Sequence, residues 1–332
     1  MTTPTVWQPL PEHIVNKLDP EYVAFHNEHI LHTRLQHQRP WDPAIRSKPT
    51  VPGESEPLQV GNIKDVKLSK FSVRVYTPEG DAPEKGWPVL LYFHGGGWTL
   101  GGIGAEASIC TNVCKRANCV VVSVDYRLAP ENPYPAAAED AVEALEWLYN
   151  KGASEINVDV NAIAVGGSSS GGNLSAICGL KASQLSPPVP IALQVLLVPV
   201  TDNTADASGT THASWRENKD TAWLNIARME WFKSNYLPNK EDWTKWDASP
   251  YFAPDELIAK APRAWVAVCE LDILRDEGVA YAEKLKRNGV QVEVKLYKGA
   301  PHQIMAMDGV TQLGKQMVSD IVDVIGKTFG TI

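Results

Sequence analysis

The chain has 332 residues, of which 44% are hydrophobic and 21% are charged, a balance typical of a globular protein with a large core. Its formal net charge of −8 disfavours nucleic acid and anionic membrane surfaces as partners. No apolar run approaches the roughly 20 residues of a membrane span, and we expect no secretory signal. Five cysteines in mostly apolar contexts indicate buried reduced thiols and favour a cytoplasmic location.

The elements predicted along the chain alternate between strand and helix. The first 46 residues look helical around positions 21–35 and then contain several prolines and tryptophans. From about residue 60, helical periodicity follows most of the apolar runs, and this alternation predicts an α/β fold with helices on both faces of a mostly parallel sheet. The predicted strands are 72–76, 89–93, 120–125, 162–165, 192–198, 265–270 and 292–297, and the predicted helices are 136–149, 172–183, 277–288 and 310–329.

A long insertion at residues 203–246 breaks this alternation. It follows the predicted strand 192–198, shows helical periodicity near 222–236 and carries five tryptophans. Ligands of open α/β sheets bind beyond the carboxyl ends of the strands, so an aromatic insertion at such an end is well placed to roof a pocket. Most of its tryptophans are more simply interpreted as packing the insertion onto the core.

The stretch 165–173, Val-Gly-Gly-Ser-Ser-Ser-Gly-Gly-Asn, lies between a predicted strand and a predicted helix. Strand, glycine-flanked serine and helix is the layout of a nucleophile elbow, G-x-S-x-G. Only Ser169 has glycine two residues away on both sides, at Gly167 and Gly171. A phosphate-binding loop would need lysine at position 172 and a hydroxyl at position 173, and this chain has Gly172 and Asn173 there. A glycine-rich turn without chemistry is the remaining alternative.

A second glycine-rich loop, His94–Gly97, ends an earlier predicted strand and is followed by Trp98. The tetrahedral intermediate of acyl transfer carries an oxyanion that needs backbone N–H donors. The HGGG-type loop supplies such donors in esterases and lipases, together with the amide after the nucleophile, which here belongs to Ser170. Because loop and elbow occur together in the expected order, two plain glycine turns are a weaker interpretation. His94 itself is interpreted as structural.

Two further residues complete a possible catalytic triad. Asp272 and His302 each follow a predicted strand, in the chain order Ser, Asp, His that accompanies this elbow. A serine hydroxyl needs a base to accept its proton, and the base needs a carboxylate to fix its tautomer. Three residues at strand ends on one sheet edge can meet in space. Two neighbouring acids are less suited to the role of the triad acid. Glu270 still lies within its predicted strand, and Asp276 lies at the start of a predicted helix.

Together these motifs resemble the hormone-sensitive-lipase-like branch of the α/β-hydrolases over roughly residues 60–330. The resemblance rests on segments 94–98, 125–131 (Asp-Tyr-Arg-Leu-Ala-Pro-Glu), 167–173, 272–278 and 299–302. It implies an α/β-hydrolase fold with a mostly parallel, eight-stranded sheet flanked by helices. It also implies a catalytic core of residues 47–202 and 247–332, a helical cap of residues 1–46 and 203–246, and carboxylic-ester hydrolysis without a cofactor.

The mechanism implied by the resemblance is that of a serine hydrolase. The serine attacks the ester carbonyl, the histidine accepts and later returns its proton, and water hydrolyses the acyl-enzyme. A capped, partly aromatic pocket favours acyl groups of short to medium length. The expected site residues are the nucleophile Ser169, the acid Asp272, the base His302, the oxyanion-hole amides of Gly96, Gly97 and Ser170, and the substrate-contacting side chains Trp98, Ile304 and Trp215.

Several positions depart from the family pattern and leave the substrate open. The family usually places an acid or threonine before the nucleophile and alanine after it, where this chain has Ser168 and Ser170. After the base, Gln303 and Ile304 stand in place of a glycine–aromatic pair. Esters are the expected substrates, but lactones, carbamates and formamides suit the same triad.

The sequence also bears on other functions and partners. A non-catalytic small-molecule receptor is the alternative class, and the presence of His302 argues against it because the plant receptors that resemble this family have lost the base. We expect no metal, because His26, His29 and His32 recur at helical spacing without further clustered ligands. A small-molecule ester is the expected partner. The alternating run 291–297 is a candidate edge for a homodimer through the last strand.

Overall fold

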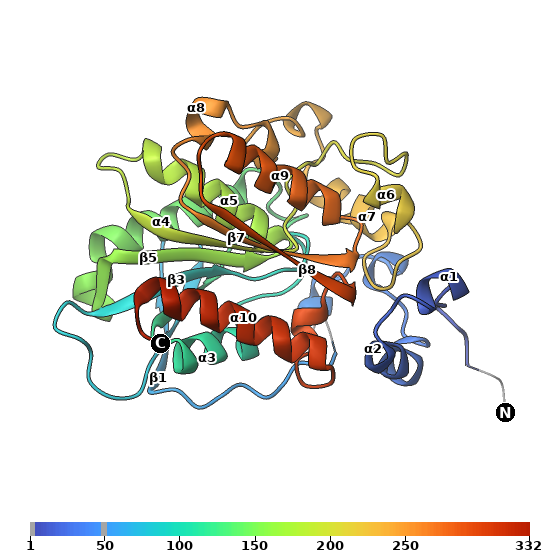
Figure 1. Ribbon diagram of the computed structural model, residues 1–332, viewed down its shortest axis with the longest axis horizontal. Coiled ribbons are helices and arrows are strands. Elements are labelled where there is room, and N and C mark those ends of the chain that lie inside the picture. The colour runs from blue at the N-terminus through green and yellow to red at the C-terminus, as the bar shows by residue number, and fades with distance from the viewer. Residues whose placement is uncertain (1–3, 48–51) are drawn as a thin grey trace.

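The computed structural model of the protein describes residues 4–47 and 52–332 (Figure 1). The strands are β1 (Asn62–Lys67), β2 (Ser72–Thr77), β3 (Trp87–Phe93), β4 (Val120–Asp125), β5 (Val158–Ser168), β6 (Ile191–Leu197), β7 (Ala264–Leu271) and β8 (Val292–Pro301). The α-helices are α1 (Glu12–Val15), α2 (Pro20–Phe25), α3 (Ala107–Arg116), α4 (Ala136–Ile156), α5 (Ser170–Lys181), α6 (Ser214–Glu217), α7 (Ile226–Tyr236), α8 (Asp255–Ile258), α9 (Arg275–Arg287) and α10 (Gln312–Phe329).

The eight strands form one sheet in the order β1-β2-β4-β3-β5-β6-β7-β8. β2 is antiparallel to both neighbours, and the pairs from β4 to β8 are parallel. α3 and α10 lie on one face of the sheet, and α4, α5 and α9 cover the other (Figure 1). The predicted α/β-hydrolase sheet with two helical layers is therefore confirmed.

Successive side chains of a strand point to opposite faces of the sheet. The apolar side chains therefore form a separate core on each face. Val89 and Leu91 of β3 pack in the cluster that contains the buried faces of α4 and α5. Leu90 and Tyr92 of the same strand pack in the cluster of α3 and α10. The sheet is thus covered on both faces, as its nearly continuous apolar runs predict.

Several elements differ from the predicted pattern, among them the short helices α1, α6 and α8, which were not predicted. β1 was not predicted because its residues are almost all exposed and polar, so no apolar alternation marks it. α3 was not predicted because Ser, Thr and Asn interrupt its apolar spacing. The helix expected over 21–35 ends at Phe25 as an α-helix and continues as a π-helix over His26–Ile30.

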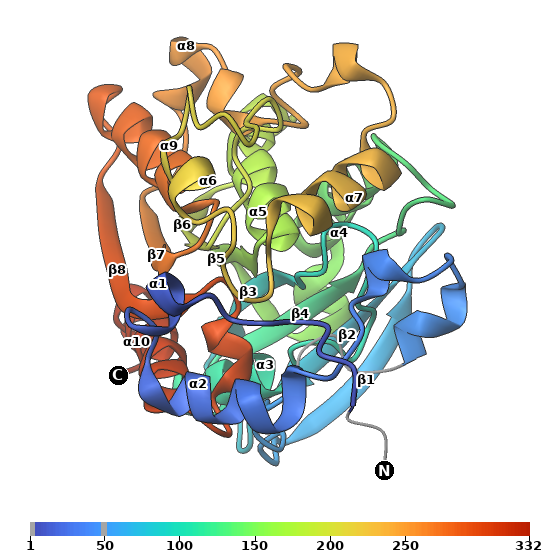
Figure 2. The same cartoon turned by 90° about the vertical axis from the view of Figure 1, so that its right-hand side faces the viewer.

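The N-terminal segment and the 203–246 insertion lie near the carboxyl ends of β5, β7 and β8 (Figures 1 and 2). They contact each other: Arg228 Nη2 donates to Gln36 Oε1 at 2.8 Å, and the rings of Trp41 and Trp231 lie 6.0 Å apart. These contacts place both segments on the side of the sheet where ligands bind in α/β folds. Their assignment to a separate cap domain stays a prediction.

All five cysteines are free thiols, and all five are buried. Burial raises the pKa of the Cys110, Cys119 and Cys269 thiols well above the usual range, so these groups are held in their neutral form. Among residues 4–47 and 52–332, none of the helices combines the length and the apolar character needed to cross a membrane.

Candidate active site

The serine elbow joins β5 to α5 at Ser169. β5 ends at Ser168, α5 begins at Ser170, and Ser169 between them has φ 54° and ψ −113°. A positive φ is uncommon for a residue with a side chain and marks a constrained turn. A Cβ on Gly171 would overlap the carbonyl oxygen of Phe93 in β3. Glycine at this position lets the turn approach β3, as the G-x-S-x-G pattern requires.

Three predicted residues meet in a chain of hydrogen bonds. Ser169 Oγ lies 3.0 Å from His302 Nε2, and His302 Nδ1 lies 2.7 Å from Asp272 Oδ2. Because Nδ1 faces a carboxylate, it carries the proton, and Nε2 is left to accept from the serine hydroxyl. The amide of Leu274 donates to Asp272 Oδ1 at 3.0 Å and fixes the carboxylate. Asp272 and His302 are fully buried, and Ser169 is 6% exposed.

The 203–246 insertion holds the loop that carries the acid. Asn218 Nδ2 donates to the carbonyl oxygens of Glu270 and Asp272 at 3.0 and 2.9 Å. The hydroxyl of Thr221 donates to the carbonyl oxygen of Leu271. Sequence reasoning missed Asn218 and Thr221, because no local motif marks a polar residue that bonds to the backbone of a distant strand.

Both acids that the sequence set aside have other partners. Glu270, in β7, accepts from the amide of Gly299 near the end of β8 at 2.8 Å. The carbonyl of Gly299 in turn accepts from the amide of Asp19 at 2.9 Å, so the N-terminal segment also holds the strand end that precedes His302. Asp276, in the first turn of α9, accepts from the amide of Ser214 at 2.8 Å. Asp272 is therefore the acid that bonds to the histidine.

The glycine loop after β3 has the backbone conformation that its residues predict. Gly96 and Gly97 adopt φ values of 124° and 60°, a region that glycine enters freely. In the described part of the chain, neither of their amides donates a hydrogen bond to a protein acceptor. The amide of Ser170 lies at the start of α5, where helical N–H groups lack an intrahelical partner. The three amides stay the predicted donors to an oxyanion.

His94 has the structural position expected of it. Its Nδ1 lies 2.7 Å from the carbonyl oxygen of Gly95, and its ring stacks on Tyr126 at 4.4 Å. Burial lowers the pKa of His94 to about 4, so the ring stays neutral beside the loop. His26 is likewise buried, with Nε2 2.8 Å from the carbonyl oxygen of Gln8. No group of three or more His, Cys, Asp or Glu side chains among the described residues could hold a metal ion.

The three side chains expected to contact substrate are all buried. The ring of Trp98 stacks on that of Tyr236 in α7 at 4.3 Å, and Trp215 Nε1 donates to Glu277 Oε2 at 2.9 Å. Neither tryptophan, nor Ile304, lines the cavity beside the glycine loop. The structure places Trp98 and Trp215 in packing roles, and a substrate contact for these residues stays a prediction.

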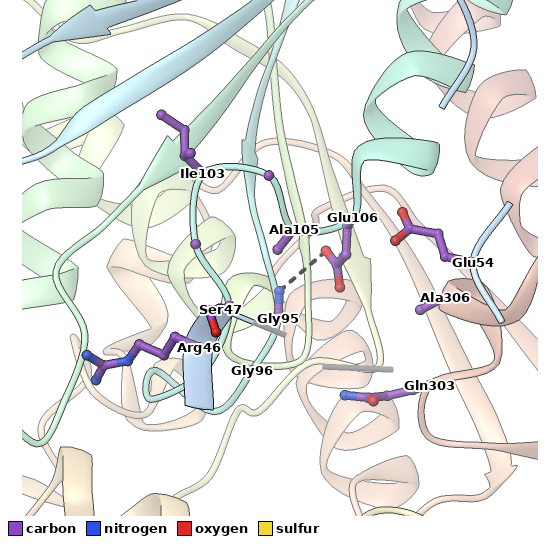
Figure 3. A pocket seen from close by; sticks show the side chains of 13 residues that line it. Arg46, Ser47, Glu54, Gly95, Gly96, Ile103, Ala105, Glu106, Gln303 and Ala306 are labelled. Carbon is purple, nitrogen blue, oxygen red and sulfur yellow. Dashed lines mark hydrogen bonds between the residues drawn. The ribbon is translucent and has the colours of Figure 1, made fainter. Parts of the chain in front are cut away.

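A cavity of about 430 Å³ adjoins the glycine loop and the residue after the base (Figure 3). Its lining includes the backbone of Gly95 and Gly96 and the side chains of Glu106, Gln303 and Ala306. Figure 3 shows the carboxyl of Glu106 directed at the amide of Gly95. The cavity is therefore partly polar. Of the predicted oxyanion-hole residues, Gly96 lines it and Gly97 and Ser170 do not, and Ser169 and His302 lie outside its lining. A second hollow of about 500 Å³ lies between the N-terminal segment and the insertion.

Known proteins share both the sequence and the fold of this chain. It is 42% identical to the AB hydrolase superfamily protein C1039.03 of Schizosaccharomyces pombe, over 99% of this chain and 98% of that protein. It is 38% identical to the carboxylesterase NlhH of Mycobacterium tuberculosis, over 68% of this chain and 69% of that protein. The ester-hydrolase EH1AB1 from the metagenome of Lake Arreo, solved with a phosphonate derivative, has a TM-score of 0.84 at 30% identity, covering 94% and 99% of the two chains.

A family model for the alpha/beta hydrolase fold matches residues 90–306. This range contains the glycine loop, the serine elbow and all three members of the hydrogen-bonded triad. The chain therefore belongs to the α/β-hydrolase fold family, in the hormone-sensitive-lipase-like branch that its motifs indicate.

Proposed function

We propose that this protein is a serine carboxylesterase that cleaves esters of short- to medium-chain acids through an acyl-enzyme intermediate. The observation that carries the proposal is the hydrogen-bonded chain from Ser169 through His302 to Asp272. Esters are the proposed substrates because the similar proteins include a carboxylesterase and an ester-hydrolase.

In the proposed reaction, the Ser169 hydroxyl gives its proton to His302 Nε2 as Oγ attacks the ester carbonyl. Asp272 stabilises the imidazolium and keeps its orientation. The amides of Gly96, Gly97 and Ser170 donate to the oxyanion of the tetrahedral intermediate. The imidazolium then protonates the leaving alcohol, and the same base activates water against the acyl-enzyme.

The proposed acyl length is supported by the space beside the glycine loop. The cavity measures about 430 Å³, and pockets of roughly 300–1,000 Å³ are typical of small ligands. The side chains of Glu106 and Gln303 give its wall a polar part, which suits short acids better than long hydrocarbon chains because apolar chains gain little from polar walls.

The first test is Ser169→Ala, assayed with p-nitrophenyl acetate and butyrate and with a fluorophosphonate probe. The variant should lose at least about a thousandfold in kcat and all probe labelling, because it lacks the attacking oxygen. The matched control is Ser175→Ala, a buried serine of α5 whose hydroxyl donates to the carbonyl of Gly171 at 2.8 Å. This control should keep its activity. Wild-type turnover by Ser169→Ala would contradict the assignment, and stoichiometric ligand binding without turnover by the wild type would favour a receptor.

A further inference from the structure

The carboxyl of Glu106 lies between the serine elbow and the glycine loop, and no step of the proposed reaction uses it. Ser168 Oγ donates to Oε1 of Glu106 at 2.6 Å. The Tyr92 hydroxyl and the Gly95 amide donate to Oε2 at 2.7 and 3.3 Å. Figure 3 shows the bond to Gly95 at the wall of the cavity. One side chain thus satisfies three donors from distant parts of the chain.

These donors come from the ends of two neighbouring strands. Ser168 is the last residue of β5, Tyr92 lies in β3, and Gly95 follows β3 by two residues. β3 and β5 pair in parallel, with Phe93 opposite Gly167. The proposed oxyanion donors arise from the same two strand ends: one pair after β3, and one amide after β5. Glu106 therefore joins the two halves of the proposed oxyanion hole.

The residues around this carboxyl are closely packed, and their backbone conformations are restricted. A Cβ on Gly95 would lie 2.5 Å from Ser168 Oγ and 3.1 Å from Glu106 Oε1, so only glycine lets the three groups meet. Glu106 itself has a left-handed backbone with φ 56°, which residues with a side chain rarely adopt. Such conformations persist where the surrounding structure determines them strongly, often at functional sites.

We propose that Glu106 is a positioning residue, which holds the amides of Gly96 and Gly97 and the amide of Ser170 at the spacing that one oxyanion requires. The inference rests on the proposed function. Donors act well only when they lie within hydrogen-bond distance of the developing oxyanion. Gly95 directly precedes the first donor, and Ser168 stands two residues before the last, so a shift at either contact moves a donor.

The protonation chemistry of the carboxyl agrees with this role. Burial raises the pKa of Glu106 above its ordinary value, which reduces the cost of keeping the group uncharged. A charged carboxylate bonded to the amide of Gly95 would oppose the negative charge of an oxyanion held by the next amides of the loop. Hydroxyl groups can accept as well as donate, so the bonds to Ser168 and Tyr92 persist when the carboxyl carries a proton.

The test compares Glu106→Ala and Ser168→Ala with the wild type in p-nitrophenyl butyrate hydrolysis. Both should lower kcat by about tenfold to a hundredfold while KM changes by less than about threefold, because misplaced donors weaken transition-state binding. The Ki of a trifluoromethyl ketone, which Ser169 converts into a tetrahedral oxyanion, should rise by the same factor. The double variant should lose no more than the larger single loss. Glu106→Gln should recover most of the activity, because its amide can bond to the same groups.

The matched control is Asp308→Ala, since Asp308 is a buried carboxyl that also accepts from two hydroxyls and one amide. Its donors are Ser55 Oγ and N and Ser108 Oγ, at 2.5, 2.9 and 2.7 Å, and none belongs to the elbow. This control should lower Tm but leave kcat and Ki unchanged.

The inference is overturned if Glu106→Ala and Ser168→Ala keep wild-type kcat and Ki, or if Asp308→Ala loses as much kcat at an equal loss of Tm. Should Glu106→Ala fail to fold, Ser168→Ala decides, because it removes a single hydroxyl. A wild type that neither turns over esters nor reacts with a fluorophosphonate would instead refute the proposed function. The two failures are therefore distinguishable.

Discussion

The three consecutive serines of the elbow have three different environments. Ser169 Oγ faces the imidazole of His302, whereas Ser168 Oγ donates to the carboxyl of Glu106. The Ser170 hydroxyl lies 3.4 Å from that of Tyr126. Glycine spacing was enough to single out Ser169. The partner of Ser168 stands 62 residues earlier in the chain, and no local pattern links the two.

At the residue scale, Asp272→Asn tests the orientation of the base. Its amide cannot hold the tautomer that leaves His302 Nε2 unprotonated, so kcat should fall by about ten thousandfold with little change in KM. The measurement is steady-state hydrolysis of p-nitrophenyl butyrate. The neighbouring Asp276→Asn is the control, because the carboxylate of Asp276 bonds to Arg275 and Ser214 and not to the histidine. Its kcat should fall far less. Comparable losses of kcat in the two variants would contradict the assignment of Asp272 as the acid of the triad.

At the scale of elements, α7 of the insertion packs directly onto the glycine loop. The ring of Phe232 lies where a side chain on Gly97 would point, and Tyr236 stacks on Trp98 with an angle of 8° between the rings. The periodicity of the sequence predicted this helix but not its contact with the glycine loop. Periodicity shows which face of a helix is apolar, and it does not show which segment packs against that face. Trp98 therefore links the loop to α7 from within the core.

Gly97→Ala tests this packing. The added Cβ would overlap the Phe232 ring, and φ 60° is unfavourable for alanine, so the loop must move and its amides with it. We expect kcat to fall by about a hundredfold, measured with the same ester. Gly289→Ala is the control, because Gly289 has φ 85° with no atom within 4 Å of the added carbon. It should cost about 1 kcal/mol of stability and no activity. An active Gly97→Ala enzyme would show that α7 does not constrain the loop.

At the scale of the whole molecule, the insertion is joined to the core by buried titratable groups. Glu277 is fully buried and accepts from the amide of Thr201 and from Trp215 Nε1. Burial raises the pKa of Glu277 to about 8. Nearby, His212 Nε2 bonds to Asp202 Oδ2 at 2.9 Å. Burial opposes the charge on His212, but the carboxylate prevails and raises its pKa.

These two shifts lower stability as pH rises, whereas the lowered pKa of buried His94 acts in the opposite direction below its ordinary value of 6.5. Between the ordinary pKa of Glu277, 4.5, and about 8, the folded protein binds more protons than the unfolded chain, so the free energy of unfolding decreases with pH. His212 acts in the same direction, because a raised histidine pKa contributes stability that is lost above it. Glu277→Gln should make the decrease of the free energy of unfolding with pH shallower, by up to about 1.4 kcal/mol per pH unit.

Urea unfolding from pH 5.5 to 8.5 measures this slope for the wild type, Glu277→Gln and the control Glu143→Gln. Glu143 bonds to Ser69 at the protein surface, and its substitution should leave the slope unchanged. A wild-type slope in Glu277→Gln would show that its carboxyl does not titrate in this window.

The sequence predicted most of the fold and the triad, because each depends on a local signal. Apolar runs mark buried strands, and the glycine-flanked Ser169 followed by Asp272 and His302 has the chain order that accompanies this elbow. β1 carries no apolar alternation, and the roles of Glu106 and Asn218 arise only from packing between distant segments. The homodimer through the last strand stays a prediction, although β8 does lie at an edge of the sheet.

The end of β8 that precedes His302 is held by the N-terminal segment. Gly299 of β8 accepts from the amide of Asp19, and His302 follows Ser169 by 133 residues. During synthesis, the elbow with Ser169 leaves the ribosome long before the histidine exists. On the proposed assignment, a nascent chain therefore carries a serine without a base. The order of synthesis delays the appearance of a reactive nucleophile until His302 has been made.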